Sequence, residues 1–298
     1  MESKKVLTYG LLLSVILIWA LSWPISKLGL MDMPPMWYSA FRLVVGFVTI
    51  FIILLFQKKI KIPKKQDIPL IMSIGLLQMA CFLILINGGL LFVDAGRSAI
   101  LVYSTPFLIT PIAVLFFDER LTKAKLIGLL LGGLGILLLF NPWTFNWHDH
   151  HTLIGNVLLL LAAVCWAVAM LHTRYGIWHS PSIQLVPWQL LIAGFFVIMA
   201  CLILNPHPQI NWNSRLIWTG LYNGILATGF AYAAIIYVSQ KLPVINTSLL
   251  LLGVPVAGLV FSSLLLSEKL TWVTSAALAL IISGLIAIAM DKSTDIKA

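Results

Sequence analysis

The sequence predicts an all-α membrane protein with ten transmembrane helices arranged as two inverted five-helix repeats, and three observations lead to this prediction. The 298 residues are 60% hydrophobic and only 10% charged, whereas soluble domains carry roughly a quarter charged residues. The apolar residues form stretches of about 20, which is the length that a helix needs to cross a bilayer. The segment "FFDERLT" at 116–122 recurs as "LLSEKLT" at 265–271, each time after a long apolar stretch.

The apolar stretches are separated by short loops that carry proline, asparagine or charge. They are too long and too uniformly apolar for the strands of a membrane barrel, so we expect helices. The first stretch follows Lys4 and Lys5, as a signal peptide would, but it is too long for one and shows no clear cleavage site. The predicted spans are 6–26, 36–56, 69–92, 98–117, 124–141, 153–173, 183–204, 216–238, 245–266 and 272–290.

Lysine and arginine predict the orientation. With a cytoplasmic N-terminus and ten crossings, 14 of the 19 basic residues fall on the cytoplasmic side, Arg42 falls inside a span, and four fall outside: Lys27, Arg97, Arg215 and Lys269. Cytoplasmic loops of membrane proteins carry such an excess. We therefore expect both termini in the cytoplasm, and we assign the net charge of +9 to membrane topology and not to nucleic-acid binding.

The two halves of the chain, residues 1–145 and 146–298, align with each other in order. The aligned pairs are Trp19 with Trp166, Arg42 with Gln189, Gln78 with Asn223, Pro106 with Pro255, and Glu119 with Glu268. Five spans is an odd number, so the second half is expected to enter the membrane in the opposite orientation. The two acidic signatures then face opposite sides of the membrane. Inverted repeats of this kind are typical of secondary transporters.

These features together resemble the EamA group of the drug/metabolite transporter superfamily. The shared features are a tryptophan in the first helix of each half, a proline within each fourth helix, and the ending acid-Arg/Lys-Leu-Thr. The resemblance implies two EamA-like repeats, 1–145 and 146–298, in a bacterial-type inner membrane. It also implies export or exchange of small metabolites such as amino acids. The cavity of such proteins is lined by helices one, three, four, six, eight and nine, while helices five and ten lie away from it.

Pro106 and Pro255 are hinge candidates. A proline inside a helix removes one backbone hydrogen bond and kinks the helix, and in a membrane the freed carbonyl needs another partner or a water-lined cavity. Two interpretations stay open: a pliable helix beside the cavity, or a static kink that aids packing. The symmetric placement of the two prolines favours the first.

Aromatic side chains near mid-span are candidates for substrate binding. Trp19 and Trp166 lie near the middle of their spans, whereas membrane tryptophans usually lie at the interfaces. A buried indole N–H needs a partner. These residues are expected either to floor a cavity and stack on a substrate or to pack in the core, and the same alternatives apply to Trp23, Tyr103 and Tyr232.

Three amides and one cation inside the spans complete the predicted substrate-binding set. Gln78, Asn87 and Asn223 either recognise a zwitterionic substrate or hold helices together. Arg42 is the only charge well inside a predicted span, a position that costs about 2.5–3.5 kcal/mol on insertion scales. It either extends to the lipid headgroups or packs among the helices, or it faces the cavity and binds a carboxylate.

No pattern in the sequence predicts a cofactor or a metal. "HDHH" at 148–151 has metal-ligand residue types, but adjacent side chains rarely converge on one ion without further ligands. Cys81, Cys165 and Cys201 lie in apolar stretches without metal-ligand spacing, so we expect them to be buried as small apolar side chains.

The predicted energy source follows from the lack of acidic residues near the middle of the predicted spans. No Asp or Glu lies near mid-depth, which favours facilitated diffusion or exchange over a relay of membrane carboxylates. The sequence shows no nucleotide-binding loop, so ATP is not the direct energy source.

Other functions stay open at this point. The same fold suits a lipid-linked or nucleotide-type metabolite carrier or an uptake permease, and a non-transporting membrane subunit is a further alternative. An enzyme is not expected, because no catalytic groups converge in the sequence. The expected partners are a small-molecule substrate and membrane lipid, with the chain a monomer or a homodimer.

Overall fold

The computed structural model describes residues 2–140, 149–266 and 272–290, and within these ranges the chain forms helices and no strands. Eight helical segments are long and apolar enough to cross a membrane, which confirms an all-α architecture of membrane-spanning character. These segments are Lys5–Gly29, Pro35–Phe56, Lys65–Gly89, Ala95–Phe117, His150–Tyr175, Ser182–Leu204, Ser214–Lys241 and Val244–Leu266.

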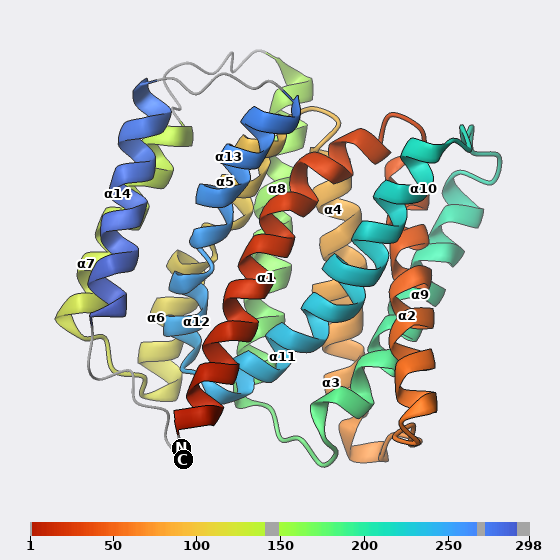
Figure 1. The fold of residues 1–298 in the computed structure, drawn as a ribbon, viewed down its shortest axis with the longest axis horizontal. Helices are drawn as coiled ribbons and strands as arrows, with labels where there is room; N and C mark the ends of the chain where they lie inside the picture. The colour runs from red at the N-terminus through yellow and green to blue at the C-terminus, as the bar shows by residue number, and fades with distance from the viewer. Residues whose placement is uncertain (1, 141–148, 267–271, 291–298) are drawn as a thin grey trace.

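The remaining two predicted spans, 124–141 and 272–290, correspond to the helices α7 (Lys123–Phe140) and α14 (Trp272–Ala289). Each has 18 residues and is mostly apolar, although α7 carries Lys123 and Lys125 in its first turn. The two pack against each other along one edge of the bundle, away from α1 (Figure 1). The count of ten crossings stays a proposal that includes this pair.

Four of the spanning segments are single helices: α1 (Glu2–Gly29), α2 (Pro35–Phe56), α8 (His150–Tyr175) and α9 (Ser182–Leu204). Two others change their winding near mid-span. One runs through η1 (Lys65–Asp67), α3 (Ile68–Ser73), η2 (Ile74–Cys81) and α4 (Phe82–Gly89); the other runs through α10 (Ser214–Leu221), η4 (Tyr222–Phe230) and α11 (Ala231–Lys241). Both η2 and η4 are π-helical, and such wide turns often lie at functional sites.

The two hinge candidates lie where helices are interrupted and not inside kinked helices. The first interrupted span consists of α5 (Ala95–Val102) and α6 (Thr105–Phe117), with Pro106 in the first turn of α6. The second consists of α12 (Val244–Leu250) and α13 (Gly253–Leu266), with Pro255 in the first turn of α13. Each proline thus follows an interruption of its span, where the missing N–H of proline removes a helical hydrogen bond. A hinge role for the two prolines stays a prediction.

The helices of the two halves interleave. In the described structure α1 packs against α13, α2 against α9 and η4, α4 against α8, and α6 against α8 and α12. Figure 1 shows α1 crossing the middle of the bundle between helices of the second half. Residues 1–145 and 146–298 therefore share one core.

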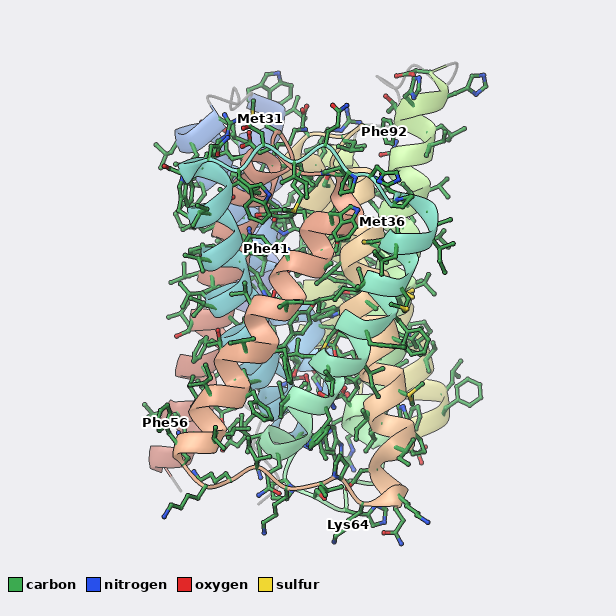
Figure 2. The ribbon with its side chains drawn as sticks, turned by 90° about the vertical axis from the view of Figure 1, so that its right-hand side faces the viewer. Met31, Met36, Phe41, Phe56, Lys64 and Phe92 are labelled. Carbon is green, nitrogen blue, oxygen red and sulfur yellow. The ribbon has the colours of Figure 1, made fainter. Side chains whose placement is uncertain are left out.

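The two ends of the bundle carry different connections. Lys64 lies at one end and Met31 at the opposite end in Figure 2. In Figure 1, α6 ends at the lower end, where α1 begins and α14 finishes, whereas α13 ends at the upper end. The interrupted segments α5–α6 and α12–α13 thus run in opposite directions. Glu268, predicted to mirror Glu119, lies outside the described residues.

Glycines set the spacing between α7 and α14. The sequence "GLLLGGLG" at 128–135 contains small residues at spacings that allow close helix packing in membranes, and Gly128 and Gly135 face α14. A Cβ added at Gly135 would lie 2.6 Å from Cγ1 of Ile281 and 2.8 Å from the carbonyl oxygen of Ala277. The backbones of the two helices therefore approach too closely for any side chain at this position.

We predict that Gly135→Ala lowers the free energy of unfolding by about 1–3 kcal/mol, the usual cost of overpacking a core. The matched control is Gly194→Ala, because a Cβ at Gly194 on α9 meets nothing within 4 Å. Thermal unfolding of both purified variants in detergent checks this, with a lower Tm expected for Gly135→Ala alone. Equal Tm values would mean that α7 and α14 are not in close contact.

Candidate functional site

A narrow cavity lies in the shared core of the two halves. Its lining is mainly aromatic and aliphatic, with two serines and one arginine, and no Asp or Glu contributes to it. The lining residues are Trp19, Ser22, Trp23, Ser26, Arg42, Phe82, Leu83, Ile86, Leu90, Tyr103, Trp166 and Tyr232. About 20 Å³ of its interior is open to a water-sized sphere, which is room for about one water molecule.

One face of α1 forms a wall of the cavity. Trp19, Ser22, Trp23 and Ser26 follow the spacing i, i+3, i+4, i+7 and therefore lie on one side of the helix. They extend from the middle of α1 to its last turns. The cavity therefore runs from mid-depth towards the end of the bundle where α1 finishes and α5 begins (Figure 1).

Four aromatic rings close the deeper end of the cavity. The ring centroids of Trp19 and Trp166 are 5.1 Å apart with an interplanar angle of 83°, an edge-to-face contact. Phe82 lies 4.8 Å from Trp166, and Tyr232 lies 5.9 Å from Trp19. Such pairs contribute about 0.5–1.5 kcal/mol beyond their burial. Trp19 and Trp166 both line the cavity, and their stacking on a substrate stays a prediction.

Two hydrogen bonds join the halves at this floor of the cavity, one donated by each half to the other. The indole N–H of Trp19 donates to the carbonyl of Ala227 at 2.9 Å, and the hydroxyl of Tyr232 donates to the carbonyl of Gln78 at 3.0 Å. Both acceptors lie in the π-helical segments η4 and η2. Each half thus supplies an aromatic donor to a main-chain acceptor of the other.

Arg42 lies at the wall of the cavity, inside the helix bundle. The residue is 2% exposed, and its Nε donates to the hydroxyl of Thr228 at 3.1 Å. Its Nη1 has no hydrogen-bond partner among the described residues. Tyr38, Tyr222 and Tyr232 lie within electrostatic range of the guanidinium. The interpretation of Arg42 as a headgroup anchor is therefore wrong for this structure.

The three predicted amides lie behind the lining. Asn223 accepts from the hydroxyl of Ser22 at 2.7 Å and donates to the hydroxyl of Tyr38 at 2.8 Å. Asn87 donates to the hydroxyl of Ser39 at 2.8 Å. Gln78 is buried, and it contributes its main-chain carbonyl to the floor. Six of the nine predicted substrate-binding residues therefore line the cavity, and Gln78, Asn87 and Asn223 support it from outside.

Some lining residues were not predicted. Ser22 and Ser26 follow Trp19 and Trp23 at helical spacing, so the periodicity of α1 carried a signal that identifies them. Phe82, Leu83, Ile86 and Leu90 lie on α4 or just after it. Their side chains are like those of any buried helix, and no sequence feature separates them from ordinary core residues.

A network of hydrogen bonds ties the two halves together at the end of the bundle where α1 finishes. The carboxylate of Asp32 accepts from Arg215 Nε at 2.6 Å and Nη2 at 2.8 Å, and from Asn213 Nδ2 at 2.8 Å. The hydrogen bonds from Arg215 first, and those from Asn213 and Asn211, outweigh the effect of burial and hold the pKa of Asp32 below its ordinary value. Asp32 therefore stays ionised at neutral pH.

A second carboxylate ties the halves at the opposite end. Glu119, in the connection after α6, accepts from the hydroxyl of Tyr175 at 2.8 Å. It also accepts from the main-chain N–H groups of Val244 at 2.8 Å and Ile245 at 3.2 Å. These two N–H groups begin α12, where an acidic side chain is favourable. The acid of the first repeated signature thus caps a helix of the second half.

Within the described residues, the motif "HDHH" at 148–151 contributes a helix cap. Asp149 accepts from the main-chain N–H of His151 at 3.1 Å and from the hydroxyl of Thr152 at 2.6 Å, so it caps the start of α8. His148 lies outside the described residues.

Of the three cysteines, only Cys201 is buried. The prediction of buried cysteines is confirmed for Cys201 and wrong for Cys81, which is exposed, while Cys165 is partly exposed.

The fold and the cavity together define a polytopic membrane protein with a central chamber between two interleaved halves. The model of the EamA-like transporter family matches residues 6–141 and 153–290. The chain therefore belongs to the EamA-like transporter family, within the drug/metabolite transporter superfamily.

Relatives and a solved structure agree with this assignment. The chain is 30% identical over 260 residues to the uncharacterized transporter YoaV of Bacillus subtilis, covering 87% of this chain and 89% of the relative. It is 29% identical over 284 residues to a probable amino-acid metabolite efflux pump of Escherichia coli, covering 92% of both chains. A crystal structure shares its fold with a TM-score of 0.76 at 18% identity, covering 95% of this chain and 98% of that chain.

We predict that Asp32→Asn lowers the free energy of unfolding at neutral pH by about 1–2 kcal/mol, since a charged partner of Arg215 is lost. Because the pKa of Asp32 is lowered on folding, its contribution is present above the unfolded pKa of about 3.9 and is lost as pH falls through the folded pKa. The Tm values of wild type and variant should therefore converge in acid.

The matched control is Asp94→Asn at the same end of the bundle. Asp94 is 71% exposed and lies 3.7 Å from Lys27, and exposed ion pairs contribute little. A Tm profile from pH 7 to pH 3 in detergent measures both variants. A difference in Tm between wild type and Asp32→Asn that stays constant with pH would contradict the role assigned to the charge of Asp32.

Proposed function

We propose that this protein is a secondary transporter that moves a small amphiphilic metabolite, such as an amino acid, across the inner membrane by alternating access. Export or exchange is the proposed direction, both termini are proposed to be cytoplasmic, and no cofactor is involved. The proposed architecture is ten spans in two inverted repeats, 1–145 and 146–298. The central observation in support is a nearly closed aromatic cavity enclosed by both halves.

The inverted repeat is supported by contacts between aligned residues. Residues close to a twofold axis contact their own mates, and the aligned pair Trp19 and Trp166 is in edge-to-face contact at the floor of the cavity. The interrupted segments α5–α6 and α12–α13 run in opposite directions (Figure 1). The π-helical segments η2 and η4 occupy corresponding positions in the third span of each half.

Alternating access is supported by the ties at the two ends. Asp32 joins the halves at one end and Glu119 joins them at the other. With both ties made, about 20 Å³ is open in the cavity, which is too little for an amino acid. A substrate can therefore enter only when one tie opens, and both ends opening together would leave a pore.

The positions of the acidic side chains in the described residues support exchange or facilitated diffusion. The acidic side chains Asp32, Asp67, Asp94, Asp118, Glu119 and Asp149 lie in the connections between the spanning segments or at their ends. A carboxylate that carries a proton across the membrane needs a position in the transport path. The cavity lining offers none, so the substrate gradient itself is the proposed driving force.

A groove on the outside of the bundle bears on the alternative of a lipid-linked substrate. It encloses about 740 Å³ between α2, α9 and α11, and its lining is mostly apolar and includes Tyr237 and Lys241. An apolar groove of this kind suits lipid tails. A flippase needs a cluster of basic residues for the headgroup, and Lys241 is the one basic residue that lines the groove. We therefore assign the groove to contact with membrane lipid.

We predict that Trp19→Ala reduces counterflow of the transported solute by tenfold or more, because it removes an aromatic contact and the hydrogen bond to Ala227. The assay is exchange of labelled amino acids and related metabolites by purified protein in liposomes. The matched control is Trp272→Ala, since Trp272 is 80% exposed at the start of α14.

Two outcomes would contradict the proposal. If Trp19→Ala and Trp272→Ala change counterflow equally in correctly inserted protein, the cavity is not the transport site. If the wild-type protein moves no solute from a broad panel while its relatives do so in the same liposomes, the assignment of transport to this chain is wrong.

A further inference from the structure

The guanidinium of Arg42 is a buried cation that the surrounding protein satisfies only in part. One nitrogen, Nε, is held by the hydroxyl of Thr228 at 3.1 Å. Another, Nη1, is buried and has no partner among the described residues. The side chain is nevertheless part of the cavity wall. The bond to Thr228 holds one edge of the guanidinium, while Nη1 stays available for a further acceptor.

No carboxylate of the described residues neutralises this charge. Ion pairs in these ranges include those of Lys27 with Asp94, His179 with Asp67, and Arg215 with Asp32, and no acidic side chain is among the charged groups that act on the guanidinium of Arg42. The groups near the guanidinium are the tyrosines Tyr38, Tyr222 and Tyr232, which are neutral at physiological pH. Arg42 is thus the only charged residue in a lining of aromatic, aliphatic and hydroxyl side chains.

An unpaired cation in such surroundings is costly. Desolvating an ion inside a protein costs several kcal/mol unless an opposite charge and hydrogen bonds compensate. Arginine also forms two parallel hydrogen bonds to a carboxylate, which adds geometric selectivity. A cavity with one cation and no anion therefore favours a substrate that brings a negative charge.

We infer that Arg42 is the residue that selects substrates by their carboxylate, and that an amino group on the substrate is dispensable. This inference rests on the proposed transport function and specifies its substrate class as small carboxylates with an apolar body. The carboxylate pairs with the guanidinium. The apolar body lies against the rings of Trp19, Trp23 and Trp166.

The lining also explains why an amino group is accepted without being required. No Asp or Glu lines the cavity to bind an ammonium group. The hydroxyls of Ser22 and Ser26 and the faces of the aromatic rings can accept one weakly. A zwitterionic amino acid and its deaminated analogue therefore fit the same site, whereas the amide of that amino acid lacks the required charge.

The test compares matched solutes in two shapes. The aromatic set is L-phenylalanine, 3-phenylpropionate and L-phenylalaninamide, and the aliphatic set is L-leucine, 4-methylpentanoate and L-leucinamide. Inorganic phosphate serves as an anion without an apolar body. Thermal stabilisation of the purified protein and counterflow in liposomes are both measured. The carboxylates, with or without the amino group, should bind at least tenfold more tightly than the amides and phosphate.

Arg42→Gln tests the residue directly, since glutamine is the aligned residue in the second half at Gln189. The variant should lose the preference for carboxylates over amides, while Arg42→Lys should keep part of it. The ligand-free Tm of Arg42→Gln should equal or exceed that of the wild type, because an uncompensated buried charge is removed. Lys27→Gln is the matched control, since Lys27 is bonded to the carbonyl of Val93 and lies outside the lining.

Each result decides the inference. Equal binding of amides and carboxylates, binding of none of these probes, or tight binding of phosphate would overturn it. A lower ligand-free Tm in Arg42→Gln with an unchanged preference for carboxylates would show a structural role instead. Because transport of any other solute would leave the proposed function intact, failure of the carboxylate rule is distinguishable from failure of transport.

Discussion

The structure depends on the requirement that polar groups buried in a bilayer find partners inside the protein. At the floor of the cavity each half meets this requirement through the other. The indole of Trp19 needs the carbonyl of Ala227, and the hydroxyl of Tyr232 needs the carbonyl of Gln78. Since each acceptor lies in a π-helical segment, the irregular winding of both spans lies at a contact between the halves.

This arrangement explains why the cavity and the ties belong to one system. The carboxylates that join the halves lie at the two ends of the seam, Asp32 at one and Glu119 at the other. The aromatic floor and Arg42 lie between them. In the proposed mechanism, a movement of one half against the other changes the floor and both ends together, and the interruptions between α5 and α6 and between α12 and α13 are the proposed hinges.

Much of this could be predicted from the sequence because lipid imposes simple rules. Length and hydropathy located the spans, and Trp19 and Trp166 were identified because mid-span indoles are unusual. The chain could not show that Pro106 and Pro255 begin new helices, because the same residue also kinks continuous ones. Nor could it show that Asn87 and Asn223 bond to other helices instead of lining the cavity, since an amide in a span suits either role.

Side-specific labelling of cysteines tests the central claim most directly. In a protein without native cysteines, Ser26→Cys in the cavity wall and Ser248→Cys on α12 are treated with a membrane-impermeant maleimide from each side. The account predicts labelling from opposite sides, with Glu119→Gln raising labelling at position 248 and lowering it at position 26, and with Asp118→Asn changing neither. Labelling of both positions from one side, or a parallel rise at both, would contradict it.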